Sequence, residues 1–385
     1  MNFRSILKRG FAKISASEPL KIKMSDMDPH LIPSNIALPT ETTATSEELI
    51  FTFQEMYKMR RMEQKADALY KERLIKGFCH LYNGQEGLGV GLEMGLNYND
   101  HMITAYRDHV QAYLRGISIY EIFCEMMGKK DGSSKAKGGS MHFYNKKNNY
   151  YGGNGIVGAQ IPVGVGLAFG IKYQKNKENV AVAMYGDGAA NQGQLYEAAN
   201  MASLWKLPVI LLCEMNFYAM GTSVERSSTG GNAFHKKIYN VPGIKVNGQD
   251  VFEMREATRF AKKFAIENGP IIMNVHTYRY QGHSMSDPGT TYRVRDFDAF
   301  WRREMDPVKI ARQRLLDNEV STEEEIVAME KEIKRFIDGE IERAMKCEPA
   351  PLDYLLEDVY DPNDKMFVRA PNYEDSVFIK EKLIN

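Results

Sequence analysis

Three short apolar runs give the clearest structural signal in the sequence. Residues 180–184 and 207–213 form two of them, the first ending at a Gly-Asp-Gly turn and the second containing the breaker Pro208. Small and apolar residues recur between them at helical spacing, as Leu195, Ala198, Ala199 and Ala202. A strand, a helix and a strand in this order predict two parallel strands. Gly269-Pro270 introduces the third run, 271–275, which predicts a third strand of the same sheet.

The remaining periodicity defines the domain organisation. Helical spacing begins near residue 46, after a segment rich in proline, serine and threonine that predicts a linker over residues 24–45. Ser321 with Glu324 predicts a capping box that opens a long amphipathic helix to about Lys346, with apolar positions Ile326, Met329, Ile333, Phe336, Ile341 and Met345. We expect one α/β domain over 46–320, a mostly parallel sheet flanked by helices, and a helical C-terminal extension with a tail over 321–385.

Composition and charge exclude several classes of function. The 385 residues are 43% apolar and 26% charged, enough for a substantial core. Fifty basic residues balance fifty acidic ones, which leaves no electrostatic case for nucleic acid binding. No apolar run approaches the roughly 20 residues of a membrane span. The four cysteines, Cys79, Cys124, Cys213 and Cys347, lack metal-ligand or redox spacing.

The first 23 residues differ from the rest of the chain. They contain six basic residues and one acid, Glu18, with apolar residues at amphipathic spacing. This composition is typical of a mitochondrial transit peptide that is removed after import. A disordered basic tail is the alternative interpretation.

Small residues at four-residue spacing occur in two predicted helices. They are Gly87, Gly91 and Gly95 in one, and Gly166 and Gly170 in the other. In water this spacing indicates close approach of helices rather than a membrane dimer. It fits two helices of one chain and two helices of different chains equally well.

Candidate chemistry follows the first two strands. Asp187 and Asn216 come directly after the runs 180–184 and 207–213, at the sheet edge where open α/β folds bind ligands. One carboxylate, one amide oxygen and one main-chain carbonyl suit Mg²⁺, which completes its shell with phosphate oxygens. Gly-Asp-Gly alone is more typical of an ordinary turn. The spacing to the Asn-bearing loop is what favours a metal site.

The sequence resembles a known family in several separate segments. Gly-Asp-Gly at 186–188, followed by 26 residues (189–214) and the Asn216 loop, resembles the thiamine diphosphate signature. Further matching segments lie, in the family's order, at 77–81, 84–86, 103–107, 137–142, 151–160 and 278–288. Over roughly residues 45–370 the chain resembles the α subunits of the pyruvate dehydrogenase E1 component. This resemblance implies the thiamine diphosphate-binding fold.

The resemblance also implies roles for individual residues. It places Mg²⁺ on Asp187, Asn216 and the carbonyl of Tyr218, and the cofactor diphosphate against Gly188 and Ala189. Other implied positions are phosphate contacts at Tyr106, Arg107 and His283, active-site histidines at His80 and His283, a prop for the bent cofactor at Met220, and backbone support of its aminopyrimidine at Gly155 and Val157.

Several of these residues have simpler interpretations. His80 follows the apolar Phe78 and fits a satisfied core histidine. Arg107 could pair with Asp108, and Met220 would by itself be assigned to the core. His283 is better supported, because it lies in a Gly-rich polar loop after a strand.

For the chain as a whole, the resemblance implies oxidative decarboxylation of pyruvate and reductive acetylation of the lipoyl groups of an E2 component, in the mitochondrial matrix. Cofactor activation needs a carboxylate that we cannot place in this sequence. In the resembled family a β subunit supplies it, within an α₂β₂ heterotetramer. Ser223, Ser284 and Thr291 match phosphorylation positions, which implies a regulatory kinase and phosphatase.

Two departures from the family leave alternatives open. Met215 stands where a second Asn is usual and Ala219 where Gly is usual, which motivates a non-catalytic regulatory paralogue as an alternative. On sequence alone, Met215→Asn should leave cofactor affinity unchanged or raise it. The other alternative is a branched-chain 2-oxo acid dehydrogenase. A nicotinamide-dependent dehydrogenase is disfavoured because no G-x-G-x-x-G follows a first strand.

Overall fold

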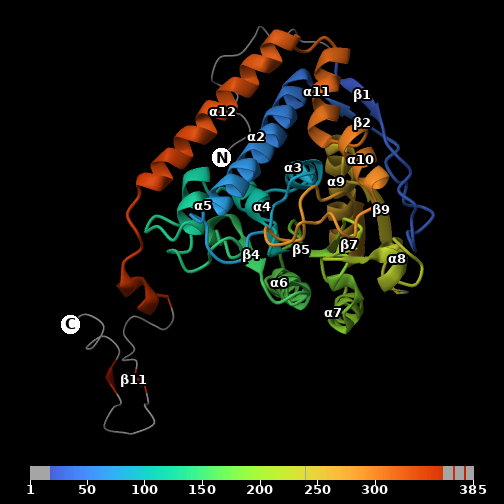
Figure 1. Cartoon of the computed structure of the whole chain (residues 1–385). Coiled ribbons are helices and arrows are strands. Elements are labelled where there is room, and N and C mark those ends of the chain that lie inside the picture. Colours follow the sequence, from blue (N-terminus) through green and yellow to red (C-terminus); the bar gives the residue numbers. More distant parts are fainter. Residues whose placement is uncertain (1–17, 239, 359–366, 369–376, 379–385) are drawn as a thin grey trace.

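The computed structural model describes residues 18–238, 240–358, 367–368 and 377–378, and is built around one six-stranded parallel sheet (Figure 1). The strand order is β4-β3-β5-β6-β10-β9, and every neighbouring pair is parallel. The bounds are β3 His101–Ala105, β4 Tyr150–Asn154, β5 Ala181–Gly186, β6 Val209–Met215, β9 Gly243–Asn247 and β10 Ile271–His276. The predicted α/β class and the parallel pairing of β5 with β6 are confirmed.

Helices cover both faces of this sheet. On one face lie α6 (Gln160–Tyr173) and α7 (Gly193–Leu204), and on the other α3 (Glu86–Gly95) and α9 (Val251–Asn268). Successive residues of β6 enter opposite apolar clusters, so the strand is buried on both faces. Such strands read as continuous apolar runs, which is why β5, β6 and β10 were recognisable in the sequence.

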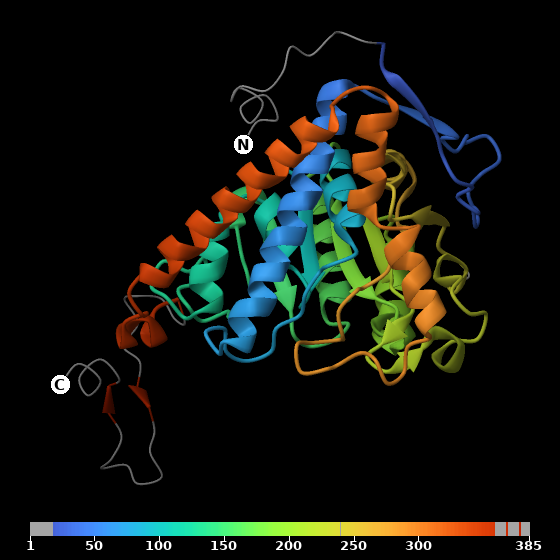
Figure 2. The same cartoon turned by 45° about the horizontal axis from the view of Figure 1, so that its top comes forward.

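An outer layer of long helices lies over α3. The helix α2 (Ser46–Lys71) contacts α3, and α12 (Glu323–Lys346) crosses α2 and α5 (Ile119–Met126), as Figure 2 shows. Three buried residues of α12, Ile333, Ile337 and Ile341, belong to the same apolar cluster as one face of the sheet. The predicted C-terminal extension is therefore a layer of the domain.

The start and the register of α12 differ from the prediction. The capping box is formed by Thr322 and Glu325, one residue later than the expected pair. Phe336 and Met345 are about half exposed, whereas Ile337 and Ala344 are buried. The buried apolar face of a helix winds gradually around its axis. Phe336 and Met345 continue the apolar spacing in the sequence but therefore lie on the solvent-facing side of α12.

The segment predicted as a linker is ordered against the domain. Strand β1 (Leu20–Lys23) pairs antiparallel with β2 (Glu41–Ala44), and Met24 and Met27 are buried. Arg255 of α9 donates hydrogen bonds to Thr42 and Thr43, which fixes β2 to the domain. Strand β1 lies inside the predicted transit peptide, whose residues 1–17 are outside the described part of the chain.

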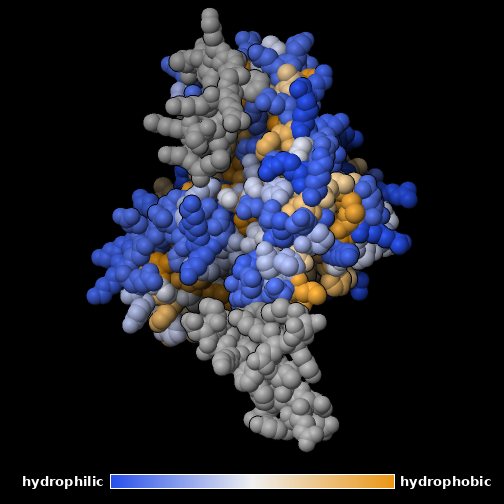
Figure 3. Space-filling model, turned by 90° about the vertical axis from the view of Figure 1, so that its left-hand side faces the viewer, coloured by the Kyte–Doolittle hydropathy of each residue, from blue (hydrophilic) through white to orange (hydrophobic). Residues whose placement is uncertain are grey.

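The remaining elements are short, except for α11. They are α4 His109–Leu114, α8 Val224–Ser227, α10 Arg295–Arg303, α11 Pro307–Asp317, β7 Tyr218–Ala219, β8 Thr222–Ser223, β11 Phe367–Val368, β12 Val377–Phe378, and the 3₁₀ turns η1 Lys146–Asn148, η2 Ala189–Asn191, η3 Phe234–Lys236 and η4 Leu352–Leu356. None of the helices in the described ranges is both long and apolar enough to cross a bilayer. Hydrophilic residues predominate on the face drawn in Figure 3, with smaller apolar areas between them.

The two glycine-spaced helices have different surroundings. On α3, a Cβ at Gly87, Gly91 or Gly95 would lie within 2.7 Å of atoms in the loop before α9 or on α9 itself. Those glycines therefore serve packing within the chain. On α6, Gly166 and Gly170 face open space, and the same helix exposes Val163, Phe169 and Tyr173.

Candidate functional site

The carboxyl ends of β5 and β6 bring the predicted metal ligands together. Asp187 follows β5, Asn216 follows β6, and both line one cavity of about 220 Å³. Ten residues predicted from the sequence line this cavity: Tyr106, Arg107, Val157, Asp187, Gly188, Ala189, Asn216, Tyr218, Met220 and His283. His80 and Gly155 do not line it. The other lining residues are Ala105, Gln160, Gly186, Glu214, Ala219 and Arg279.

Two oxygen atoms at this edge are buried without a partner. They are Oδ2 of Asp187 and Oδ1 of Asn216, on side chains that are 3% and 8% exposed. An unsatisfied buried polar atom costs about 1–3 kcal/mol, so a pair of them indicates a ligand. The described residues contain no group of three His, Cys, Asp or Glu side chains suited to a metal ion. The donor set is thus hard, oxygen-only and poor in charge, which suits Mg²⁺ bound together with phosphate.

Burial also tunes the acidity of the carboxylate. It raises the pKa of Asp187 to about 6, against the opposing effect of the Gly188 backbone N–H and the charge of Arg279. A nearby cation would restore the ionised form. The free carboxyl therefore titrates at higher pH than an ordinary aspartate.

The orientation of Asn216 is set by a residue that was not given a role from the sequence. Nδ2 of Asn216 donates a hydrogen bond to Oε1 of Gln85 at 3.2 Å, which leaves Oδ1 as the free end of the amide. Gln85 is fully buried at the N-terminus of α3. Its Nε2 lies 3.5 Å from Oε1 of Glu214, which also accepts a hydrogen bond from Tyr82 Oη at 2.8 Å. Gln85 therefore positions the predicted metal ligand.

Glu214 is a carboxylate in the cavity that the sequence analysis missed. Burial raises its pKa to about 7, although the hydrogen bond from Tyr82 and the charge of Arg107 act in the opposite direction. The sequence does contain a signal for Glu214, because this acid directly follows the apolar run 207–213 and precedes Met215-Asn216. Gln85 was likewise visible within the matched segment 84–86.

Removing the amide of Gln85 gives the first testable prediction. Gln85→Leu should lower Mg²⁺ affinity about tenfold, because the Asn216 amide loses the acceptor that fixes its Oδ1. Gln85→Glu keeps the acceptor for Asn216 but loses the amide that faces Glu214, so it should lose less affinity than Gln85→Leu. Calorimetric titration of Mg²⁺ at saturating thiamine diphosphate measures the difference. Wild-type Mg²⁺ affinity in Gln85→Leu would show that other contacts hold Asn216.

Two buried guanidinium groups make the cavity electropositive. Arg107 donates to the carbonyls of Leu81 and His283 at 2.8 and 2.9 Å. Arg279 donates to the carbonyls of Gln281 and Tyr218 at 3.1 and 3.3 Å. Neither forms an ion pair with a carboxylate in the described part of the chain. The Arg107–Asp108 pair considered from the sequence is wrong, because Asp108 accepts a hydrogen bond from Tyr150 instead.

Burial and mutual repulsion disfavour the charged forms of Arg107 and Arg279. Burial lowers the pKa of Arg279 to about 9, and the positive charge of Arg107 adds to this effect. Buried charges without a counter-ion are rare in folded proteins. The arrangement suits an anionic group with several oxygens, such as a diphosphate.

The two predicted histidines meet beside Tyr106. The ring of His80 lies 4.4 Å from Tyr106 and 5.3 Å from His283, between centroids. Burial lowers the pKa of His80 to about 2 and that of His283 to about 4, with Arg107 contributing to both. Both imidazoles are therefore neutral at physiological pH. Nδ1 of His80 is buried without a hydrogen-bond partner, so His80 is not a satisfied core histidine.

The loop after β6 carries backbone strain. Phe217 and Met220 adopt left-handed conformations, with φ of 71° and 55°. Strain of this kind clusters at ligand sites. Met220 is 59% exposed at the cavity, so its assignment to the core is wrong. Gly155 is exposed beside the ring of His142, close to Val157 in sequence.

The two departures from the family pattern lie on different sides of the loop. Met215 is fully buried in the apolar cluster beneath α6 and α7. Ala219 lines the cavity, and a Cβ on Gly188 would lie 2.7 Å from its Cβ. Met215 therefore belongs to the core, whereas Ala219 narrows the cavity.

The predicted phosphorylation positions lie on surface segments near the cavity. Ser284 follows His283, and its hydroxyl lies 2.9 Å from that of Ser286. Asp287 fixes this loop by accepting hydrogen bonds from the backbone of His283 and Gly289. Thr291 is exposed, and Ser223 belongs to β8, which pairs with β7 at Tyr218.

The chain is similar to known proteins over most of its length. The sequence model of the family described as "Dehydrogenase E1 component" matches residues 54–352. A protein of Solanum tuberosum named pyruvate dehydrogenase E1 component subunit alpha, mitochondrial, is 51% identical over 85% of this chain and 83% of its own length. A Dictyostelium discoideum protein of the same name is 51% identical over 84% of this chain and 85% of its own. The testis-specific form of Rattus norvegicus is 48% identical, over 86% and 84%.

Proposed function

The chain belongs to the dehydrogenase E1 component family, and from this premise we propose that it is the α subunit of a thiamine diphosphate-dependent pyruvate dehydrogenase. Relatives of about 50% identity over more than four fifths of the chain carry that name. The observation that carries the proposal is the pair of unpartnered oxygens on Asp187 and Asn216 beside two uncompensated arginines.

The residues at one end of the cavity would bind the metal ion and the diphosphate of the cofactor. Asp187, Asn216 and the Tyr218 carbonyl would hold Mg²⁺, and Arg107 and Arg279 would neutralise the diphosphate. When bound, thiamine diphosphate supplies the carbon nucleophile for the keto group and the ring that accepts the electrons left by CO₂. The protein's part is to bind, orient and surround it.

The histidines would act at the substrate end. A neutral imidazole can both donate and accept a proton, and its low pKa keeps His80 and His283 in that form. Neighbouring cations lower the pKa further, and the same positive field attracts an anionic 2-oxo acid. Val157 and Met220 would form apolar walls that exclude water from the reacting carbon.

Activation of the cofactor would require a second chain. Asp187 and Glu214 are the carboxylates among the lining residues; the first would hold the metal, and the second is bonded to Tyr82 and Gln85. We therefore expect a β subunit to supply the activating carboxylate within an α₂β₂ heterotetramer, which would pass the acetyl group to an E2 lipoyl domain. The basic N-terminus and the mitochondrial relatives support location in the mitochondrial matrix.

Reconstitution tests this proposal. The chain should co-purify with a β partner and then decarboxylate pyruvate with added thiamine diphosphate and Mg²⁺. Higher kcat/KM for 3-methyl-2-oxobutanoate than for pyruvate would favour the branched-chain alternative. Failure with every 2-oxo acid in a verified assembly would favour a regulatory paralogue.

Regulation by phosphorylation is the second testable prediction. Ser284→Glu should lower the activity of the assembled enzyme at least tenfold, because the added charge would compete for the nearby arginines or repel the anionic substrate. Ser284→Ala should be far milder, since it loses only the hydroxyl contact with Ser286. Steady-state assays at saturating cofactor measure both, and equal activities would contradict the prediction.

A further inference from the structure

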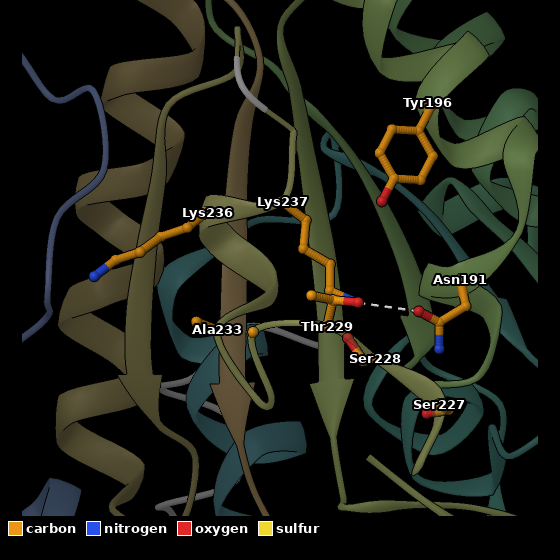
Figure 4. Close-up of a pocket in the computed structure, with 9 residues that line it drawn as sticks. Asn191, Tyr196, Ser227, Ser228, Thr229, Ala233, Lys236 and Lys237 are labelled. Atoms are coloured by element: carbon orange, nitrogen blue, oxygen red, sulfur yellow. Dashed lines mark hydrogen bonds between the residues drawn. The ribbon is translucent and has the colours of Figure 1, made fainter. Parts of the chain in front are cut away.

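A second cavity lies outside the site just described. It is open to solvent, has a volume of about 570 Å³ and lies between the start of α7, the preceding turn η2 and the segment 227–237 (Figure 4). Its lining includes two lysines, Lys236 and Lys237, the amide of Asn191 and several hydroxyls. None of its lining residues is shared with the cavity that holds Asp187.

The ammonium group of Lys237 is the charge available in this cavity. Nζ donates a hydrogen bond to Oδ1 of Asn191 at 3.0 Å and lies 3.8 Å from the ring centroid of Phe234. No carboxylate in the described ranges forms an ion pair with it. The adjacent Lys236 points away in Figure 4 and pairs with Asp28 at 2.7 Å. One of two neighbouring lysines is thus neutralised, and the other is held by neutral groups.

Hydroxyl groups surround Lys237. Oγ of Ser228 is buried and has no hydrogen-bond partner. The side chains of Ser227, Thr229 and Tyr196 line the same space, and the hydroxyl of Tyr196 points into it in Figure 4. The hydroxyl of Ser227 donates to the carbonyl of Val224 at 3.4 Å, whereas that of Ser228 is unpartnered. A hydroxyl can donate one hydrogen bond, so Ser228 and the ammonium group match an oxygen-rich anion. Lysine is a common phosphate ligand that acts as a point charge.

We propose that this cavity binds a phosphate group, either as inorganic phosphate or as the monoester of a small metabolite. The volume exceeds what one phosphate fills, which leaves room for an attached organic group. Asn191 links the cavity to the metal loop, because its Nδ2 lies 3.4 Å from the carbonyl oxygen of Asp187. An anion that draws Lys237 away from Asn191 would therefore alter a contact of that loop.

The test is calorimetric titration of the assembled enzyme with inorganic phosphate and, separately, with glycerol phosphate. Saturating thiamine diphosphate and Mg²⁺ occupy the other anion site during these titrations, and a repeat without them keeps the result independent of the proposed function. Wild type should show one saturable site. Lys237→Met should weaken it at least tenfold, and the matched control Lys236→Met should leave it unchanged.

The outcomes are decisive in both directions. Tighter binding of glycerol phosphate than of inorganic phosphate would assign the site to a metabolite, and the reverse order to the free anion. Ser228→Ala gives an independent loss of affinity if Lys237→Met does not fold. No saturable binding, or an equal loss in the Lys236 and Lys237 variants, would overturn the proposal.

Discussion

Replacing Asp187 with alanine is expected to abolish Mg²⁺-dependent binding of thiamine diphosphate, with an affinity loss of at least 100-fold. In the proposed site the carboxylate would be the charged member of an otherwise neutral ligand set, so its removal would leave Mg²⁺ without an anionic protein ligand. Calorimetry on the assembled enzyme measures the loss. Unchanged Mg²⁺-dependent binding would mean that the Gly-Asp-Gly loop is an ordinary turn.

Asp187 should also lower the free energy of unfolding of the cofactor-free protein. Because burial raises its pKa from 3.8 to about 6, the ionised carboxylate costs the cofactor-free protein about 3 kcal/mol at neutral pH. Asp187→Asn should therefore raise the melting temperature of the cofactor-free enzyme while it destroys tight metal binding. For a carboxyl whose folded pKa is raised, stability is greatest below the unfolded pKa and is lost as pH rises through 6. The stabilising effect of Asn should therefore disappear as pH falls towards 4.

The second large effect concerns Met215. We expect Met215→Asn to lower the free energy of unfolding by about 3 kcal/mol or more, because the change removes a fully buried side chain and places an amide in an apolar cluster. This expectation reverses the one drawn from sequence alone, which treated residue 215 as part of the cofactor loop. Its backbone carbonyl does accept a hydrogen bond from Thr277, but its side chain packs in the core.

Denaturant unfolding of the assembled enzyme measures this loss. Met215→Leu, which nearly conserves volume, is the matched control and should cost less than about 1.5 kcal/mol. Unchanged stability of Met215→Asn together with tighter cofactor binding would restore the sequence-based account. It would show that the amide finds a partner in the loop.

The parts of the fold that the sequence predicted are those in which one local pattern decides the structure. The strands β5, β6 and β10 are largely apolar and buried on both faces, which is typical of central strands in a parallel sheet. The strands β3, β4 and β9 contain His101, two glycines and Lys245, and only their neighbours in the sheet identify them as strands. The linker prediction was wrong for the same reason, since Met24 and Met27 are buried by residues far away in sequence.

The site residues that could be predicted from the sequence are likewise those placed by a local pattern. Asp187 and Asn216 were predictable because the ends of adjacent parallel strands must lie at one edge of the sheet. Gln85 and Glu214 were not assigned, because their roles depend on hydrogen bonds across 131 and 132 positions of sequence, from Asn216 to Gln85 and from Tyr82 to Glu214. Arg107 shows the same limit. Its neighbour Asp108 suggested an ion pair, whereas the fold turns the two side chains to different partners.

The exposed apolar face of α6 would make the stability of the subunit depend on protein concentration. Val163, Phe169 and Tyr173 remain exposed there, beside two glycines with open space around them. If a partner subunit covers this apolar area, association would supply part of the free energy that stabilises the subunit. The melting temperature of the purified protein should then fall on dilution. A cell that synthesises the chain in excess of its partners would hold the surplus in a less stable form.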